Sequence, residues 1–133
     1  MSVAYVDTSV LTAIAFDEPG AAAHVQRLGE FARLISSNLL EAELRAAVAR
    51  EDLLFHEKLI ARIEWILPNG TLASEFATVL EAGYLRGADL WHVATALYVS
   101  PNPGSLSFVT LGIRQCAVAE ALGFHVLRKA ESP

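Results

Sequence analysis

Short apolar segments alternate with longer segments of helical periodicity, and this alternation restricts the fold more than any other feature of the chain. The short segments are rich in β-branched and aromatic residues, which favour strands. They occupy residues 3–6, 33–36, 107–110 and 125–127. Strands that are separated by helices pair in parallel and are covered on both faces. We therefore predict an α/β fold in which helices flank both faces of a mostly parallel sheet of four or five strands.

The helical segments are those in which apolar residues recur every three or four positions. We predict helices at residues 10–15, 21–30, 39–50, 53–66, 72–82, 89–99 and 114–122. The segment 53–66 carries the widest apolar stripe, and Pro68-Asn69-Gly70 follows it as a break. The sequence thus predicts seven helices between and after the strands.

The chain of 133 residues has the length of one ordinary domain. We expect one domain over residues 1–128 and a loose tail at 129–133. Hydrophobic residues make up 53% of the chain, which is more than a domain of this size hides by itself. Part of the apolar surface is therefore expected to face a partner.

Charge and cysteine content restrict the class of protein. The formal net charge of −5 argues against a protein that holds nucleic acid through a positive surface. A nuclease remains compatible, because bound metal ions reverse the local sign. Cys116 is the one cysteine, so we expect no internal disulfide, a small core residue and a reducing compartment. No apolar run approaches the ~18 residues of a membrane span, and we expect a soluble, cytoplasmic protein without membrane contact.

Asp7 directly follows the first predicted strand and is followed by Thr8 and Ser9. In parallel α/β sheets, ligands bind at the carboxyl edge, where strands end and helices begin. A carboxylate at this edge can hold a hard cation. The alternative is that Asp7 or Ser9 only caps the next helix.

Two further acids lie near the starts of predicted helices. Glu43 falls among the apolar positions of segment 39–50, whereas Glu41 points to another side. Asp89 opens the strongly apolar segment 89–99, although aspartate is favoured in the first turn of any helix. Glu43 has the alternative of a solvated helix charge. His92 could be the partner of Asp89, a metal ligand or a packed, hydrogen-bonded histidine.

Four motifs follow one another along the chain: YVDTS at 5–9, SNLLEAELR at 37–45, LRGADLWHVATAL at 85–97 and FVT at 108–110. In this order and spacing they resemble the PIN-domain family, and the chain looks most like the VapC ribonuclease toxins of bacterial type II toxin–antitoxin pairs. The resemblance continues through AEALGFHV at 119–126 and covers nearly the whole chain. Each motif alone is weak, and the specificity comes from all four in order.

The resemblance implies a metal site that is made of acids. Asp7, Glu43 and Asp89 would be the catalytic carboxylates and would hold one or two Mg²⁺ or Mn²⁺ ions, with Ser9 hydrogen-bonding beside Asp7. Carboxylates that converge without a cation cannot all stay ionised, so one of the three is expected to have a raised pKa. The cation would activate water and polarise the phosphodiester.

The chain departs from the family at the fourth acid, which normally lies two residues after the threonine of the FVT strand. That threonine is Thr110, a supporting residue, and the position of the acid is Gly112. A missing ligand on the second-metal side implies reduced activity. Arg86 and Arg114 border the site and would contact phosphate, or would be solvated surface charges.

The resemblance also implies partners. VapC-like proteins cleave RNA, are typically homodimers, and are held inactive by a VapB-like antitoxin whose C-terminal segment lies in a groove near the acids. The apolar stripe of 53–66, together with Trp65, Phe76 and Tyr84, would build the dimer face and this groove, or would be core. An arginine of the antitoxin that reached Asp7 and Glu43 would occupy the place of the cation.

Two other classes remain. One is a catalytically weakened PIN-like domain that acts as a binding module, which Gly112 favours. The other is a phosphatase of the haloacid-dehalogenase type, whose nucleophile is also an aspartate after the first strand. That family has a second aspartate two residues later, where this chain has Ser9. The phosphatase is therefore the more remote alternative.

Overall fold

The computed structural model describes residues 2–127 and confirms the α/β fold, with a five-stranded sheet in which all neighbouring strands are parallel. The strands are β1 (Val3–Val6), β2 (Arg33–Ser37), β3 (Ile63–Ile66), β4 (Ser107–Val109) and β5 (His125–Val126). The helices are α1 (Thr8–Ala15), α2 (Ala21–Gly29), α3 (Leu39–Arg50), α4 (Ala73–Ala82), α5 (Gly87–Val99) and α6 (Ile113–Leu122). Two short 3₁₀ turns, η1 (Glu57–Leu59) and η2 (Pro103–Ser105), complete the described part. The predicted tail at 129–133 lies outside the described residues.

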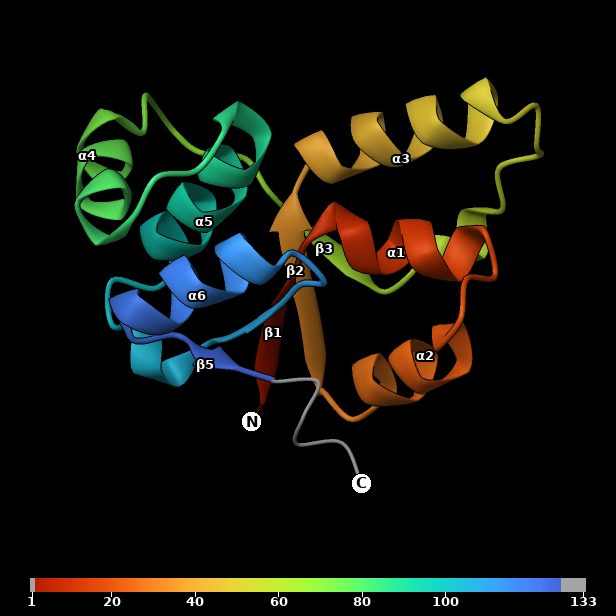
Figure 1. Ribbon diagram of the computed structural model, residues 1–133, viewed down its shortest axis with the longest axis horizontal. Helices are drawn as coiled ribbons and strands as arrows, with labels where there is room; N and C mark the ends of the chain where they lie inside the picture. The colour runs from red at the N-terminus through yellow and green to blue at the C-terminus, as the bar shows by residue number, and fades with distance from the viewer. Residues whose placement is uncertain (1, 128–133) are drawn as a thin grey trace.

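The strand order is β3-β2-β1-β4-β5, so β1 lies in the middle of the sheet (Figure 1). From β1 the chain first builds outward through β2 and β3, and later returns to the other side of β1 through β4 and β5. Asp7, at the carboxyl end of β1, donates its backbone N–H to the carbonyl oxygen of Val109 at 2.9 Å. The strand order thus reverses between β1 and β4. Open α/β sheets form their binding crevice at such a switch point.

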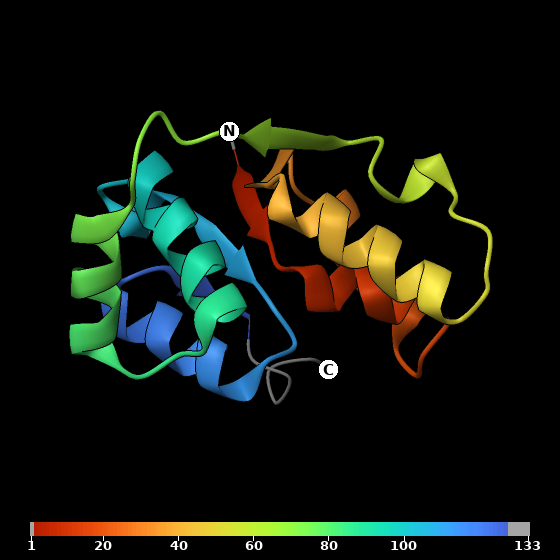
Figure 2. The same cartoon turned by 90° about the horizontal axis from the view of Figure 1, so that it is seen from above.

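Helices cover the two faces of the sheet as two groups, with α1, α2 and α3 on one side and α4, α5 and α6 on the other (Figure 2). Alternate residues of β1 contribute to the two cores: Ala4 and Val6 pack in the cluster with α1 and α3, and Tyr5 packs in the cluster with α5 and α6. The ring of Tyr5 stacks on that of Phe108 at 5.2 Å between centroids. Both faces of β1 are thus buried, as a central parallel strand requires.

The predicted helix at 53–66 is wrong. Its last part is the edge strand β3, which pairs in parallel with β2, and its middle part forms only the short turn η1. In β3, Ile63 is buried and the next residue, Glu64, is exposed, which is the alternation of a strand. A short apolar run fits both periodicities, and here the free edge of β2 decides the outcome. The other elements agree with the prediction within one or two residues, and no helix within residues 2–127 is long and apolar enough to cross a membrane.

Candidate active site

Asp7 is 5% exposed and lies where β1 passes into α1. Its Oδ2 accepts a hydrogen bond from the backbone N–H of Ser9 at 3.0 Å, so Asp7 does cap α1. Its Oδ1 accepts a second bond, from the Gln115 amide at 3.1 Å, and the Thr110 hydroxyl lies 3.4 Å from Oδ2. The cap therefore accounts for only part of the environment of this buried carboxylate, which is held from both α1 and α6.

Glu43, in the first half of α3, points toward β1 and α5. Its Oε1 accepts hydrogen bonds from the Thr8 hydroxyl at 2.7 Å and from His92 Nε2 at 2.8 Å. Partial burial raises the pKa of Glu43, but the hydrogen bonds from His92 and Thr8, with the charge of His92, outweigh burial and lower the pKa below its usual value. Glu41, two residues earlier, instead pairs with Arg45 at the surface.

His92 is 1% exposed and connects Glu43 with the centre of the sheet. Its Nδ1 lies 2.8 Å from the Tyr5 hydroxyl, which itself accepts the backbone N–H of Ser37 at 3.1 Å. Burial raises the pKa of Tyr5, so the phenol stays protonated. The other ring nitrogen, Nε2, donates to the Glu43 carboxylate. Of the three alternatives for His92, the hydrogen-bonded histidine is the one observed, with Glu43 as partner.

Asp89 is the third residue of α5, and its side chain points to the same edge of the sheet. Burial of the carboxyl raises its pKa, and the negative charges of Asp7 and Glu43 add to this effect. The positive charges of His92 and Arg86 act in the opposite direction. The pKa of Asp89 is therefore raised, and Asp89 lies within electrostatic range of both Asp7 and Glu43.

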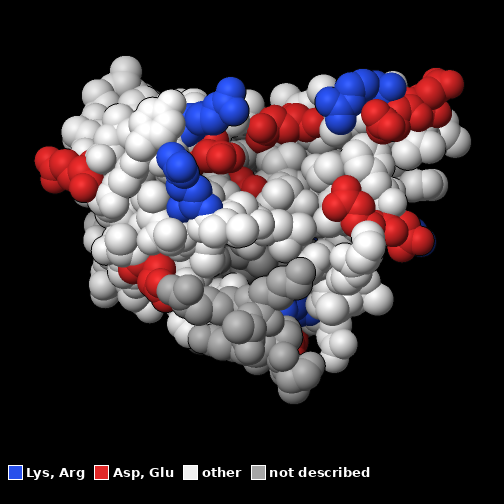
Figure 3. All heavy atoms as spheres, viewed as in Figure 1, with Lys and Arg blue, Asp and Glu red and all other residues white. Residues whose placement is uncertain are grey.

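The space-filling view shows acidic side chains around a hollow between the starts of α3, α5 and α6, with basic side chains along its margin (Figure 3). Ser9 and Thr110 border this region: their hydroxyls lie 3.4 Å apart, and the Ser9 hydroxyl accepts the backbone N–H of Leu111 at 3.1 Å. Arg86 immediately precedes α5 and acts electrostatically on Asp89. Arg114 instead lines a separate hollow with Tyr84, between the end of α4 and α6.

The fit to a metal ion depends on the donor set. Within residues 2–127, no three His, Cys, Asp or Glu side chains are arranged as a ready-made metal site. Asp7 and Glu43 direct oxygens to Gln115, Ser9, His92 and Thr8. Carboxylate oxygens are nevertheless the donors that Mg²⁺ and Mn²⁺ prefer, and such an ion needs only one or two of them beside water and phosphate. The donor chemistry fits one hard cation, and the assignment of all three acids as ligands stays a prediction.

Gly112, the position of the missing acid, is the N-cap of α6, and no side-chain hydrogen bond caps this helix. A Cβ atom added here would lie 3.5 Å from Thr110 Oγ1 and 3.5 Å from Gln115 Cβ, which are ordinary contacts. The backbone at this position is extended, with φ at −77°. The fold therefore has room for a larger side chain at position 112.

Sequence reasoning missed three side chains that hold the acids: Tyr5, Thr8 and Gln115. Tyr5 and Thr8 flank the strand end that was singled out, so their positions carried a signal. The position of Gln115 carried a signal as well. It lies three residues after Gly112 and thus one helical turn from the edge of the sheet. What the sequence did not contain was the partner of each side chain.

Comparison with known proteins gives one result that agrees with this architecture. The family model described as the PIN domain matches residues 4–120, which is most of the chain. No curated protein matches the chain significantly. The match extends from β1 into α6 and includes every acid discussed above.

Proposed function

The chain belongs to the PIN-domain family, and on this basis we propose that it is a VapC-like endoribonuclease that hydrolyses RNA phosphodiester bonds with Mg²⁺ or Mn²⁺. PIN domains are generally metal-dependent nucleases. The observation that supports the proposal most is the arrangement at the sheet edge, where the Gln115 amide holds both the Asp7 carboxylate and the backbone of Asp89, and where the charges of Asp7 and Glu43 act on Asp89. Such a group of acids at a sheet edge is typical of a site for a hard cation.

In this proposal Asp7 and Asp89 bind the cation, and Glu43 completes the site from α3. When bound, the cation would lower the pKa of a water molecule and polarise the phosphate. Ser9 and Gln115 hold the Asp7 carboxylate, and Thr8 and His92 hold Glu43, so the ligands keep their orientation. Arg86 is placed to neutralise a phosphate that lies over Asp89. With Gly112 in place of a fourth acid, one ion is expected.

The test is cleavage of single-stranded RNA by the purified protein with Mg²⁺ or Mn²⁺. Wild type is compared with Asp7→Asn, which keeps the size of the side chain and removes its charge. The matched control is Glu81→Gln, at an exposed acid of α4. We expect cleavage by wild type and by the control, dependence on the cation, and loss in Asp7→Asn. Equal cleavage by Asp7→Asn would show that the activity belongs to a contaminant.

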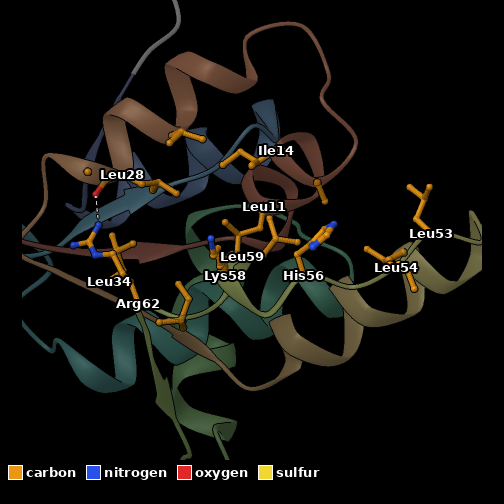
Figure 4. Close-up of a pocket in the computed structure, with 15 residues that line it drawn as sticks. Leu11, Ile14, Leu28, Leu34, Leu53, Leu54, His56, Lys58, Leu59 and Arg62 are labelled. Carbon is orange, nitrogen blue, oxygen red and sulfur yellow. Dashed lines mark hydrogen bonds between the residues drawn. The ribbon is translucent and has the colours of Figure 1, made fainter.

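We further propose that a VapB-like antitoxin and a second copy of the chain cover apolar surface, as in a VapC-like homodimer. A cavity of about 480 Å³ lies between α1, α2, the end of α3 and the segment that leads to β3. Leu11, Leu28, Leu34, Leu53, Leu54 and Leu59 lie on its walls (Figure 4). Leu54 is 84% exposed and Leu53 is 51% exposed. The helix α1, which begins directly after Asp7, contributes Leu11 and Ile14 to the same cavity.

Coexpression of the chain with its cognate antitoxin tests the groove. Leu54→Glu places a charge at the apolar wall and should prevent copurification, whereas Leu80→Glu, at an exposed leucine of α4, should not. If the Leu54→Glu variant still copurified with the antitoxin, the antitoxin segment would not bind along this cavity. Analytical ultracentrifugation of the chain without antitoxin measures whether it forms a dimer.

The second candidate, a PIN-like binding module with weakened catalysis, is favoured by Gly112. It is distinguished by calorimetric titration with Mn²⁺ in parallel with the cleavage assay. A nuclease binds Mn²⁺ and loses it in Asp7→Asn, whereas a module binds RNA without cleaving it under any cation.

A further inference from the structure

Gln115 is a polar side chain in the first turn of α6, and it is 2% exposed. Its amide nitrogen lies 3.1 Å from Oδ1 of Asp7 and 3.3 Å from the backbone oxygen of Asp89. Its amide oxygen accepts a hydrogen bond of 2.6 Å from the Thr110 hydroxyl. One buried amide thus connects the end of β1, the start of α5 and the end of β4.

The surroundings determine the orientation of this amide. Asp7 and Asp89 each present an acceptor oxygen, so only the NH₂ group can face them. The reversed amide would bring its oxygen against a carboxylate and a carbonyl, and would leave the Thr110 hydroxyl facing a donor. Both N–H hydrogens and the oxygen therefore have partners, which is what a buried amide requires.

Gln115 contacts two of the proposed metal-binding residues, Asp7 and Asp89, at the carboxyl edge of the sheet. Its amide holds Asp7, which is the one nearly completely buried acid within residues 2–127, and the same nitrogen holds the backbone of Asp89. Hydrogen-bonded groups behind metal-binding carboxylates fix their orientation, and their removal typically weakens metal binding by roughly 10–100-fold. Without the amide, Oδ1 of Asp7 would lose its donor in a buried place, and the Ser9 N–H at Oδ2 alone would hold the carboxylate.

We propose that Gln115 is a positioning residue that sets the relative placement of Asp7 and Asp89 through its amide, and so determines the affinity of the site for a divalent cation. The inference rests on the proposed function, because it assumes that Asp7 and Asp89 bind the cation. It concerns the metal-free protein and the binding step, not the cleavage step.

The test measures Mn²⁺ affinity by calorimetry and thermal unfolding of the same samples without metal. Gln115→Met keeps the length and bulk of the side chain and removes the amide, and we expect Mn²⁺ to bind about 10-fold more weakly or worse. Val118→Ala, at a buried residue of the same helix, is the control. It lowers the unfolding temperature through a cavity, but should leave the Mn²⁺ affinity of the folded protein unchanged.

Equal Mn²⁺ affinity of wild type and Gln115→Met overturns the inference, as does a wild type that binds no Mn²⁺. Should Gln115→Met not fold, Gln115→Asn replaces it: the amide is kept but is one methylene too short to reach Asp7, and the same weakening is expected. Failure of the proposed function looks different, since RNA would then stay intact in every variant while Mn²⁺ binding still depended on Gln115.

Discussion

Nε2 of His92 lies 2.8 Å from Oε1 of Glu43, although the two residues are 49 positions apart in the chain. The histidine is fixed from behind by the Tyr5 hydroxyl, which receives the Ser37 N–H and lies 2.8 Å from Nδ1. The line of hydrogen bonds runs from the sheet, through a buried ring, to an acid of the candidate site. Hydrogen bonds within the core therefore fix the orientation of the Glu43 side chain.

His92→Gln should raise the pKa of Glu43, because burial, which raises it, is then opposed by fewer hydrogen bonds and less positive charge. The change also leaves the buried Tyr5 hydroxyl without its hydrogen-bond partner on His92, at a cost of about 1–3 kcal/mol in the free energy of unfolding. Carboxyl NMR titration and chemical denaturation measure the two effects. His125→Gln, at an exposed histidine, is the control. An unchanged Glu43 pKa would show that His92 only fills space.

The contribution of Asp89 to the stability of the metal-free protein should fall as pH rises through the region just above the usual pKa of an aspartate. The pKa of Asp89 is raised in the folded state, so the folded protein binds more protons than the unfolded chain within this window. The loss of stability is complete above the raised pKa of the folded state, and no stability is lost below the usual pKa of the unfolded chain. Asp89→Asn removes this contribution, so its unfolding temperature should exceed that of wild type at neutral pH and converge with it in acid. A difference that is independent of pH would contradict the prediction.

Gly112→Asp should fold normally, because the backbone is extended and the added Cβ makes only ordinary contacts. The new carboxylate lies beside Thr110, at the edge where Asp7 ends β1. We expect tighter Mn²⁺ binding and faster RNA cleavage than in wild type, measured on the same preparation. Gly112→Asn is the matched control, with the same size and no charge. Equal gains in both variants would attribute the effect to helix capping rather than to a ligand.

Arg86→Gln should weaken the binding of single-stranded RNA and reduce its salt dependence. Each phosphate that a basic side chain neutralises contributes a slope of about −0.7 to the dependence of log K on log salt for single strands. The measurement uses the Asp7→Asn background, so that the RNA is not cleaved. Arg50→Gln, at the far end of α3, should leave the slope unchanged. An unaltered slope in Arg86→Gln would identify Arg86 as a surface charge without contact to RNA.

The sequence alone determined most of the architecture. Valine and tyrosine before Asp7 define a buried strand, and the alternation of strands with helices requires a parallel sheet with two covered faces. The position of Asp7 at the edge where ligands bind follows from the same reasoning, and helical periodicity separated Glu43 from Glu41. These features depend on neighbours within a few residues, and local patterns report such neighbours well.

Tertiary structure decided the rest. Ile63–Ile66 became a strand because β2 offered a free edge, a partner that lies outside the segment itself. His92 contacts Glu43 through folding, not through its spacing from Asp89, and Gln115 reaches Asp7 across 108 positions. Residue identity gives each side chain its donors and acceptors, whereas the choice among distant partners depends on how the helices pack on the sheet. For that reason the acids could be named from the sequence, and the residues that hold them could not.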